Sequence, residues 1–388
     1  MQEMETKENQ IIHGVIWKQL LIFFFPILLG TFFQQIYNTA DTVVVGRFVG
    51  TEALAAVGGS TSQIINLIVG FFTGLASGAT VVISQHYGAK QEDGVQKALH
   101  TAYAFSVVGG IIISIMGILI TRPLLKLMNT PDNIIDLSAT YLCIYFAGLV
   151  FVFIYNVGAG ILRAVGDSRR PLYFLILCCF INIVLDIILI VFLKMGVAGA
   201  AIATTFSQGI SAVMVTVTLC RTTDIFRLRV KKIRFHAQPM GMIVKIGLPA
   251  GLQSVMYSLS NVIIQSSLNT FGTETVAAWT AFSKIDAIYW MISGAFGIAI
   301  TTFVGQNYGA GKFGRMKKSV RVCLAMDIGA SILISAVLFF LGGYVFQLFT
   351  GDAQVIEIGV NILRRMAPAY FCFTFIEIFA GSLRGIGD

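Results

Sequence analysis

Charged residues are too scarce in this sequence for a soluble protein of its length. Only 12% of its 388 residues are charged, whereas 56% are hydrophobic, and the mean hydropathy is +0.82. A soluble domain needs more charge to cover its surface. Apolar stretches long enough to cross a bilayer recur along the whole chain. We therefore predict an all-α, polytopic membrane protein.

Motifs for enzymatic or ATP-driven chemistry are also lacking. The sequence has no Walker A or HExxH motif, and its four histidines are scattered. Its six cysteines have no metal-ligand spacing, so we expect free thiols. The acidic start has neither the basic region nor the cleavage site of a signal peptide, so we interpret residues 1–14 as a retained cytoplasmic tail. These absences predict no enzymatic activity and no cofactor.

What the sequence does have is a series of ten predicted spans. Their approximate cores are 19–46, 53–84, 100–120, 137–162, 172–193, 195–220, 246–272, 275–308, 322–349 and 355–383. Basic residues between the spans are divided unevenly, because one side holds only Arg47, Arg122, Lys126 and Lys194. The positive-inside rule then predicts a multi-pass protein of the cell membrane with its N-terminus in the cytoplasm. The net charge of +8 thus reflects topology and contact with the lipid bilayer, and we expect no nucleic acid partner.

An internal repeat divides the chain into two lobes, 15–220 and 241–388, joined by a basic cytoplasmic linker, 221–240. Four matches recur in the same order: Pro26 with Pro249, 50–56 with 272–278, 85–89 with 306–310, and 162–167 with 383–388. Six spans separate the copies, so the repeats are parallel, and such pairs enclose a cavity that opens by alternating access. The second copy ends after four of an expected six spans, which predicts a chain lacking two C-terminal spans. A natural ten-span protein is the alternative.

The repeated motifs resemble those of the multidrug and toxic compound extrusion (MATE) family, in its prokaryotic DinF-like branch. The residues that carry the resemblance are Tyr37-Asn-Thr-Ala-Asp41 with Val45-Gly-Arg47, Leu54-Ala-Ala56, Leu162-Arg-Ala-Val-Gly-Asp167 with Pro171, Gly196-Val-Ala-Gly-Ala-Ala201, and Gln306-Asn-Tyr-Gly-Ala-Gly311. The resemblance implies two six-helix lobes and export of amphipathic, typically cationic compounds in exchange for Na⁺ or H⁺. We expect a monomer.

A buried acid is the clearest candidate for coupling chemistry. Asp186 is the one charged residue of the fifth span, and Asn182 lies four residues earlier on the same helix face. A carboxylate and an amide oxygen suit Na⁺, and the carboxylate alone can carry H⁺. The alternative is an Asp–Asn pair that only joins helices.

The resemblance adds Asp41 and Thr204 to this site. It implies that Asp41 forms part of the cation site and that Thr204 presents a hydroxyl to the Asn182–Asp186 pair. From the residues alone, Asp41 is equally well an interfacial acid neutralised by Arg47. By periodicity alone, Thr204 is an ordinary packing residue and Thr205 is an equal candidate.

Further candidates concern the cavity and its motion. Pro26 is expected to kink the first span, and the resemblance ties that bending to substrate release, with a fixed kink as the alternative. Polar residues that could line the cavity, or instead anchor or join helices, are Gln34, Tyr37, Asn38 and Asn156. Glu377 is the repeat counterpart of Asn156 and could likewise face the cavity. The alternative is that it forms an ion pair with Arg364, Arg365 or Arg384.

These observations predict a secondary active multidrug exporter. The nearest rival is a lipid-linked oligosaccharide flippase of the same superfamily, which would need a cationic cavity; the spans of the first lobe contain no Lys or Arg in their cores. A membrane scaffold without transport activity is the rival from another class.

Overall fold

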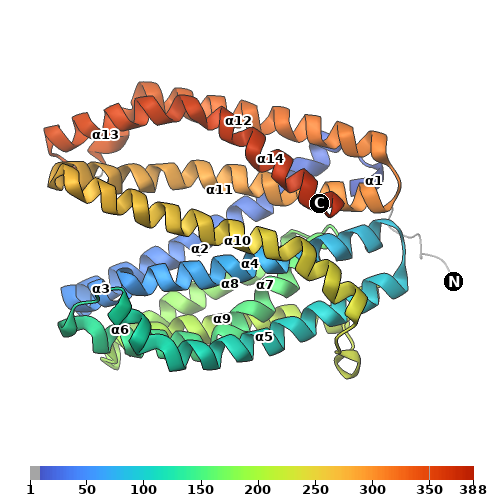
Figure 1. Cartoon of the computed structure of the whole chain (residues 1–388), viewed down its shortest axis with the longest axis horizontal. Coiled ribbons are helices and arrows are strands. Elements are labelled where there is room, and N and C mark those ends of the chain that lie inside the picture. The colour runs from blue at the N-terminus through green and yellow to red at the C-terminus, as the bar shows by residue number, and fades with distance from the viewer. Residues whose placement is uncertain (1–8, 349) are drawn as a thin grey trace. The chain divides into compact units, whose positions relative to one another are not determined.

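The computed structural model describes residues 9–348 and 350–388, and over these residues the chain is built of helices (Figure 1). The α-helices are α1 (Gln10–His13), α2 (Ile16–Phe48), α3 (Thr51–Gly58), α4 (Ser60–Gly88), α5 (Glu92–Leu127), α6 (Asp132–Ala147), α7 (Leu149–Ala164), α8 (Arg169–Asp186), α9 (Gly196–Arg221), α10 (Ala237–Leu268), α11 (Thr273–Gly309), α12 (Phe313–Gln347), α13 (Ala353–Met366) and α14 (Tyr370–Ile386). A π-helix, η1 (Ile187–Phe192), and three 3₁₀ turns, η2 (Val230–Lys232), η3 (Asn269–Phe271) and η4 (Ala367–Ala369), complete the described elements.

The number of predicted spans is confirmed. Within the described residues, nine helical stretches are long and apolar enough to cross a bilayer, and the bent pair α6 and α7 makes a tenth. The polytopic, all-α fold class is therefore correct. Residues 1–8 of the predicted tail, and Phe349 at the end of the predicted ninth span, lie outside the described residues.

The fourth span is broken where the sequence predicted one helix over 137–162. Helices α6 and α7 meet at Gly148 with a bend of 48°. A Cβ atom at Gly148 would lie 2.1 Å from Cγ2 of Thr205 on α9. Only glycine permits this close approach to α9. The hydropathy pattern is apolar on both sides of Gly148 and gives no local signal of the break.

The helices form two compact units. One unit comprises Leu29–Val255, and the other combines Met1–Leu28 with Met256–Asp388. Both α2 and α10 therefore contribute residues to each unit. The lobe boundaries 15–220 and 241–388 refer to the sequence repeat and stay a prediction.

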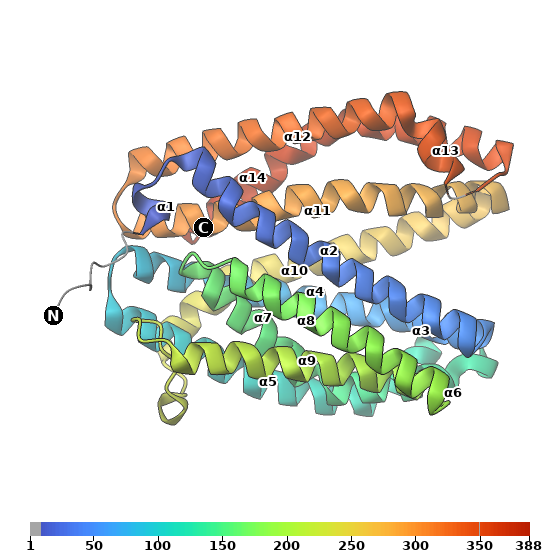
Figure 2. The same cartoon turned by 180° about the vertical axis from the view of Figure 1, so that it is seen from behind.

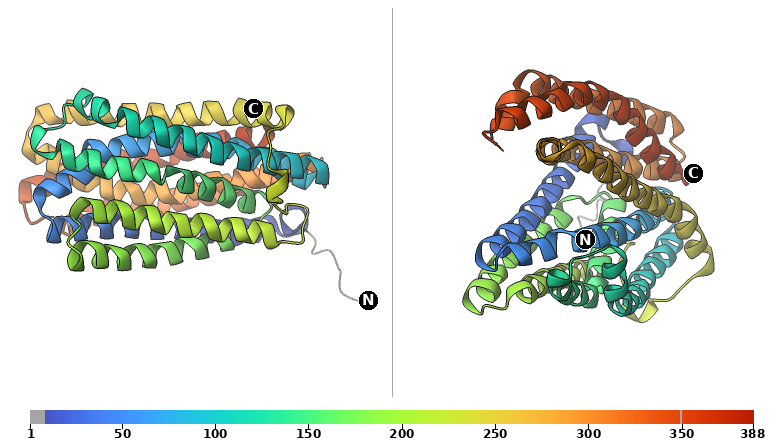
Figure 3. Two further views of the ribbon diagram at one scale, coloured as in Figure 1. Left: turned by 90° about the horizontal axis from the view of Figure 1, so that it is seen from below. Right: turned by 60° about the vertical axis from the view of Figure 1, so that its left-hand side comes forward.

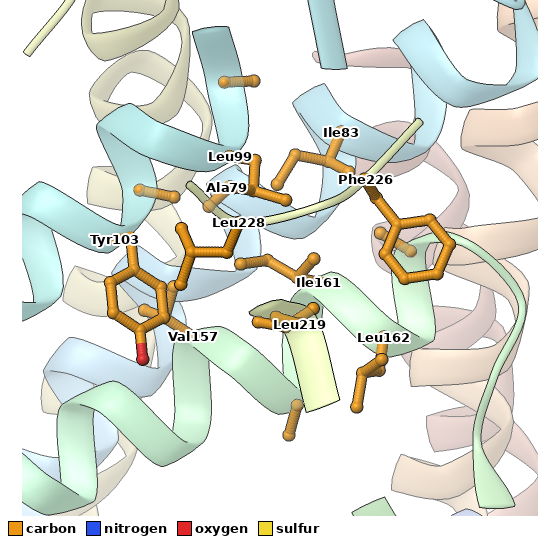
Figure 4. Close-up of a cluster of buried hydrophobic side chains, with 14 of the residues drawn as sticks. Ala79, Ile83, Leu99, Tyr103, Val157, Ile161, Leu162, Leu219, Phe226 and Leu228 are labelled. Carbon is orange, nitrogen blue, oxygen red and sulfur yellow. The ribbon is translucent and has the colours of Figure 1, made fainter. Parts of the chain in front are cut away.

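The unit Leu29–Val255 has its main core where α4, α5, α7 and α9 converge. This core includes Ile83, Leu99, Ile161 and Leu219, all at most 1% exposed. Figure 4 shows that Phe226 and Leu228, from the connection after α9, point into the same cluster. The connection is thus partly folded into the unit, although five of its fifteen residues are Lys or Arg.

Two glycine pairs bring α4 and the first part of α10 into backbone contact inside this unit. Gly74 and Gly78 on α4 face Gly247 and Gly251 on α10, each pair being spaced by four residues. A Cβ at Gly74 would lie 2.5 Å from the backbone nitrogen of Gly251, and one at Gly247 would lie 2.3 Å from the carbonyl oxygen of Leu75. Such small-residue faces allow helices to pack closely in a membrane.

The second unit is organised around α11, which packs against α12 and α14 (Figure 1). The first part of α2 joins this core through aromatic contacts, in which Phe24 stacks on Phe296 with ring centroids 4.0 Å apart. The short helix α1 is fastened to the start of α12, because Arg315 Nε and Nη2 donate hydrogen bonds to the carbonyl oxygen of Ile11 at 3.1 and 2.9 Å. The described end of the predicted tail is therefore folded onto this unit.

Candidate ion-coupling site

Four polar side chains from three helices meet inside the unit Leu29–Val255. They are Asp41 on α2, Asn182 and Asp186 on α8, and Thr204 on α9, and each is at most 6% exposed. Figure 2 shows α8 and α9 side by side, which brings Asn182 to Thr204. Thr204 Oγ1 donates a hydrogen bond to Asp41 Oδ2 at 3.0 Å. Thr204 Oγ1 in turn accepts a long hydrogen bond, of 3.5 Å, from Asn182 Nδ2.

Most carboxylate and amide oxygen atoms of this cluster have no hydrogen-bond donor among the described residues. Asp41 Oδ1, Asn182 Oδ1 and both carboxylate oxygens of Asp186 are buried without a hydrogen-bond partner among the described residues. The Asp41 and Asp186 carboxyl groups also lie close enough to interact with each other. Two neighbouring carboxylates away from water repel each other and lack solvation. The cluster therefore fits a bound proton or a small hard cation, for which carboxylate, amide and hydroxyl oxygens are suitable ligands.

The helix that carries Asp186 changes its geometry at that residue. α8 ends at Asp186, and the π-helix η1 follows directly over Ile187–Phe192. Short π segments in helices are rare and are frequently found at functional sites. The apolar run of η1 contains no residue that signals this geometry, so sequence reasoning missed it.

Tyrosine and glutamine side chains surround the cluster. Tyr37, one turn before Asp41, is 7% exposed and accepts a hydrogen bond of 3.4 Å from Gln208 Nε2. Tyr141, on α6, is buried near both carboxyl groups and stacks on Tyr145 with centroids 6.4 Å apart. Gln208 lies four residues after Thr204 and was detectable from helical periodicity. Tyr141 was not, because its proximity depends on how α6 packs against α9.

With this geometry in place, comparison with known proteins decides the family. The model of the MatE family matches residues 26–188 and 249–388, which is most of the chain. The chain belongs to this family. Its members are membrane transporters of small molecules, so the predicted transporter class is confirmed for this MATE chain.

Individual relatives agree over nearly the full chain. "Probable multidrug resistance protein YoeA" of Bacillus subtilis is 29% identical, covering 99% of this chain and 85% of the relative. "Multidrug export protein MepA" of Staphylococcus aureus (strain MSSA476) is 24% identical, and the match covers 98% of this chain and 85% of the relative. Among solved structures, an outward-facing "multidrug resistance MATE family transporter of the MOP superfamily" matches with a TM-score of 0.91, 25% identity, and coverage of 99% and 86%. A MATE structure in complex with MaD3S matches with the same score and identity, covering 98% of this chain and 85% of that one.

The remaining candidates of the first lobe have different environments in this MATE chain. Gln34 and Asn38 are exposed on α2, and Asn156 Nδ2 donates to the carbonyl oxygen of Val152 on its own helix at 2.9 Å. Pro26 is buried within α2, which continues through it as one helix, and it belongs to the unit that includes Met1–Leu28. Of the proposed cavity residues, Tyr37 is buried and lies close to Asp41.

Glu377 forms an ion pair with Arg384, which was the alternative to a position in the cavity. Its Oε1 atom lies 3.7 Å from Arg384 Nη2, and both side chains are partly buried, at 23% and 26% exposure. The carboxylate also lies over Gly297, where an added Cβ would be 2.2 Å from Oε1. The ion pair balances the charge of Glu377, so this residue has less need of a bound cation than Asp186.

A further buried acid, Asp327 on α12, is not among the residues predicted for the site. It is fully buried, Ser293 Oγ donates to its Oδ2 at 3.0 Å, and its Oδ1 has no partner among the described residues. Ser331 and Thr374 extend this polar cluster, and their hydroxyl oxygens, Oγ and Oγ1, are 2.8 Å apart. Its charge within an apolar span was a usable signal, although no neighbouring motif accompanied it.

Proposed function

We propose that this MATE chain is a secondary active exporter that exchanges amphipathic small molecules, cationic ones in particular, for Na⁺ or H⁺. The observation that carries the proposal is the buried pair Asp41 and Asp186, because Asp41 Oδ1 and both carboxylate oxygens of Asp186 lack donors among the described residues. Ionisable residues at bilayer depth are costly and are typical of ion pathways. The names of the relatives, which describe multidrug resistance and export, support the same class of cargo.

Coupling follows from charge neutralisation at this pair. A proton or Na⁺ that binds the oxygens of Asp41, Asn182, Asp186 and Thr204 removes the repulsion between the two carboxylates. The ion-bound site then prefers a different packing of α2, the helix that carries both Asp41 and Pro26. Exchange requires that the ion and the exported compound favour opposite conformations. We place the N-terminus in the cytoplasm, on the basis of the basic loops.

The proposal is tested by flux in proteoliposomes. The chain is reconstituted, and efflux of a fluorescent cationic dye is followed under an imposed Na⁺ gradient and, separately, under an imposed pH gradient. Export driven by one gradient and abolished when an ionophore dissipates it supports exchange and identifies the ion. Export that is equal with and without either gradient contradicts the proposal. Movement of a lipid-linked saccharide in the same vesicles would favour the flippase.

Thr204→Val is expected to slow export roughly tenfold. The substitution keeps the shape of the side chain but leaves Asp41 Oδ2 buried without its donor, which costs ~1–3 kcal/mol. That cost falls on the ion-free site, where Asp41 is charged, so release of the ion becomes slower. Initial rates of dye efflux under the effective gradient measure the effect. Thr204→Ser keeps the hydroxyl and should restore most of the rate; equal rates for Val and wild type would argue against a role for this hydroxyl.

A further inference from the structure

The connection between α9 and α10, residues 222–236, is the yellow-green coil between these helices in Figure 3, and its side chains pack against its own unit. Phe226 and Leu228 are only 5% and 2% exposed, and both contact the core of α4, α5, α7 and α9 (Figure 4). Gln96 Nε2 on α5 donates to the carbonyl oxygens of Ile225 and Arg227, at 2.5 and 3.2 Å. The first part of the connection therefore has a defined position at the start of α5.

The second part, Arg229–His236, is fastened to α5 at both ends. The backbone N–H of Arg229 donates to His100 Nε2 at 3.1 Å, and His100 Nδ1 contacts the carbonyl oxygen of Gln96 at 2.7 Å. The backbone N–H of His236 donates to Thr101 Oγ1 at 3.1 Å. Since His100 Nε2 accepts, the ring carries its hydrogen on Nδ1. These bonds hold the basic residues of the connection in place.

A cavity of about 530 Å³ lies between this strap of residues, 229–236, and the start of α5. Its lining residues are Glu92, Asp93, Gln96, Lys97, His100, Arg229, Lys231, Lys232, Arg234 and His236. Asp93 is engaged by Lys97, with Oδ2 and Nζ 2.6 Å apart. Among the described residues, no carboxylate forms an ion pair with Arg229, Lys231 or Lys232. The cavity therefore presents uncompensated positive charge.

Apolar side chains accompany these cations. Val230 is 64% exposed and Phe235 is 50% exposed, and both belong to the strap. The strap leads directly into α10, a candidate membrane span that starts at Ala237. Exposed apolar residues next to basic ones at the end of a span are typical of contact with the headgroup region of a bilayer.

We propose that this strap cavity binds the phosphate-bearing headgroup of an anionic phospholipid in the cytoplasmic leaflet. The assignment of the leaflet rests on the proposed orientation of the chain. Lys231, Lys232 and Arg229 supply charge and hydrogen-bond donors to the phosphate, while Val230 and Phe235 contact the interfacial region. The bound lipid holds the strap against α5 and thereby fixes the start of α10.

The cavity also predicts a pH dependence. Burial lowers the pKa of His236 below its ordinary value, and the nearby positive charges of Arg234 and Lys97 lower it further, while Asp93 opposes them. A bound phosphate adds negative charge and raises the pKa of His236. By linkage, the lipid then binds more tightly below the pKa of His236 in the complex than above it, and its stabilising effect weakens as the pH rises through that pKa.

The test measures the thermal unfolding midpoint of the purified chain in detergent. Phosphatidylglycerol, phosphatidylcholine or inorganic phosphate is added in a titration, and the half-maximal lipid concentration gives the apparent affinity. Lys231→Gln/Lys232→Gln is compared with Lys317→Gln/Lys318→Gln, a matched control that removes two exposed basic residues from α12. None of these side chains belongs to the acid cluster, and the readout does not depend on transport.

We expect phosphatidylglycerol to raise the midpoint of the wild type and of the control. The Lys231→Gln/Lys232→Gln variant should bind it roughly 25-fold more weakly, because each basic side chain near an anionic surface contributes about 1 kcal/mol, a factor of about five. His236→Asn should remove the pH dependence and keep the binding. The proposal is overturned if both double variants respond alike, or if inorganic phosphate or phosphatidylcholine stabilises as well as phosphatidylglycerol.

Discussion

Asp186→Asn is expected to reduce gradient-driven export to the level of protein-free vesicles. The amide has nearly the shape of the carboxylate but carries no negative charge, so it neither binds a proton nor attracts Na⁺ as the acid does. Without a charge to neutralise, the site no longer distinguishes ion-bound from ion-free states, and a gradient has no differential binding energy to act on. Dye efflux under the effective gradient measures the loss.

The same variant should fold at least as stably as the wild type. Both carboxylate oxygens of Asp186 are buried without hydrogen-bond donors, so replacement by the amide removes an uncompensated buried charge. Its unfolding midpoint in detergent should therefore be unchanged or higher, which separates lost coupling from lost structure. Asp136→Asn is the control, since Asp136 is 76% exposed and pairs with Arg122 at 2.7 Å. A fully active Asp186→Asn protein would remove Asp186 from the coupling site.

Hydropathy was sufficient to predict the spans, because each must present about 20 apolar residues to the bilayer. The Asn182–Asp186 pair was also detectable, since a four-residue spacing places two side chains on one helix face. The meeting of this pair with Asp41 and Thr204 was not derivable from periodicity. That arrangement depends on the packing of α2, α8 and α9, and the expectation came from the family resemblance.

Other features depend on contacts between residues far apart in the chain. The glycine at the break between α6 and α7 is required because Thr205 occupies the space that a side chain would need. The segment 221–240 was predicted as a basic linker because six of its 20 residues are Lys or Arg, whereas Phe226 and Leu228 pack its first part against the core. The participation of α2 in both compact units has no counterpart in local sequence.

Gly247→Ala is expected to lower the free energy of unfolding by about 1–3 kcal/mol, as overpacking of a tight contact does. The new Cβ would lie 2.3 Å from the carbonyl oxygen of Leu75, and a backbone atom in a helix cannot move aside alone. The start of α10 must therefore separate from α4. Chemical denaturation of the protein in mild detergent, followed by circular dichroism, measures the change.

Gly241→Ala on the same helix supplies the matched control for this prediction. Nothing lies within 4 Å of a Cβ added there, so the change should be neutral or stabilising by up to about 1 kcal/mol through helix propensity. Gly78→Ala, whose Cβ would lie 2.3 Å from the carbonyl oxygen of Ile243, should behave like Gly247→Ala. Once one substitution has separated the helices, the second has less contact left to disrupt, so the double variant should lose less than the sum of the two. Equal stability of the Gly241→Ala and Gly247→Ala proteins would mean that the two glycine pairs do not hold α10 against α4.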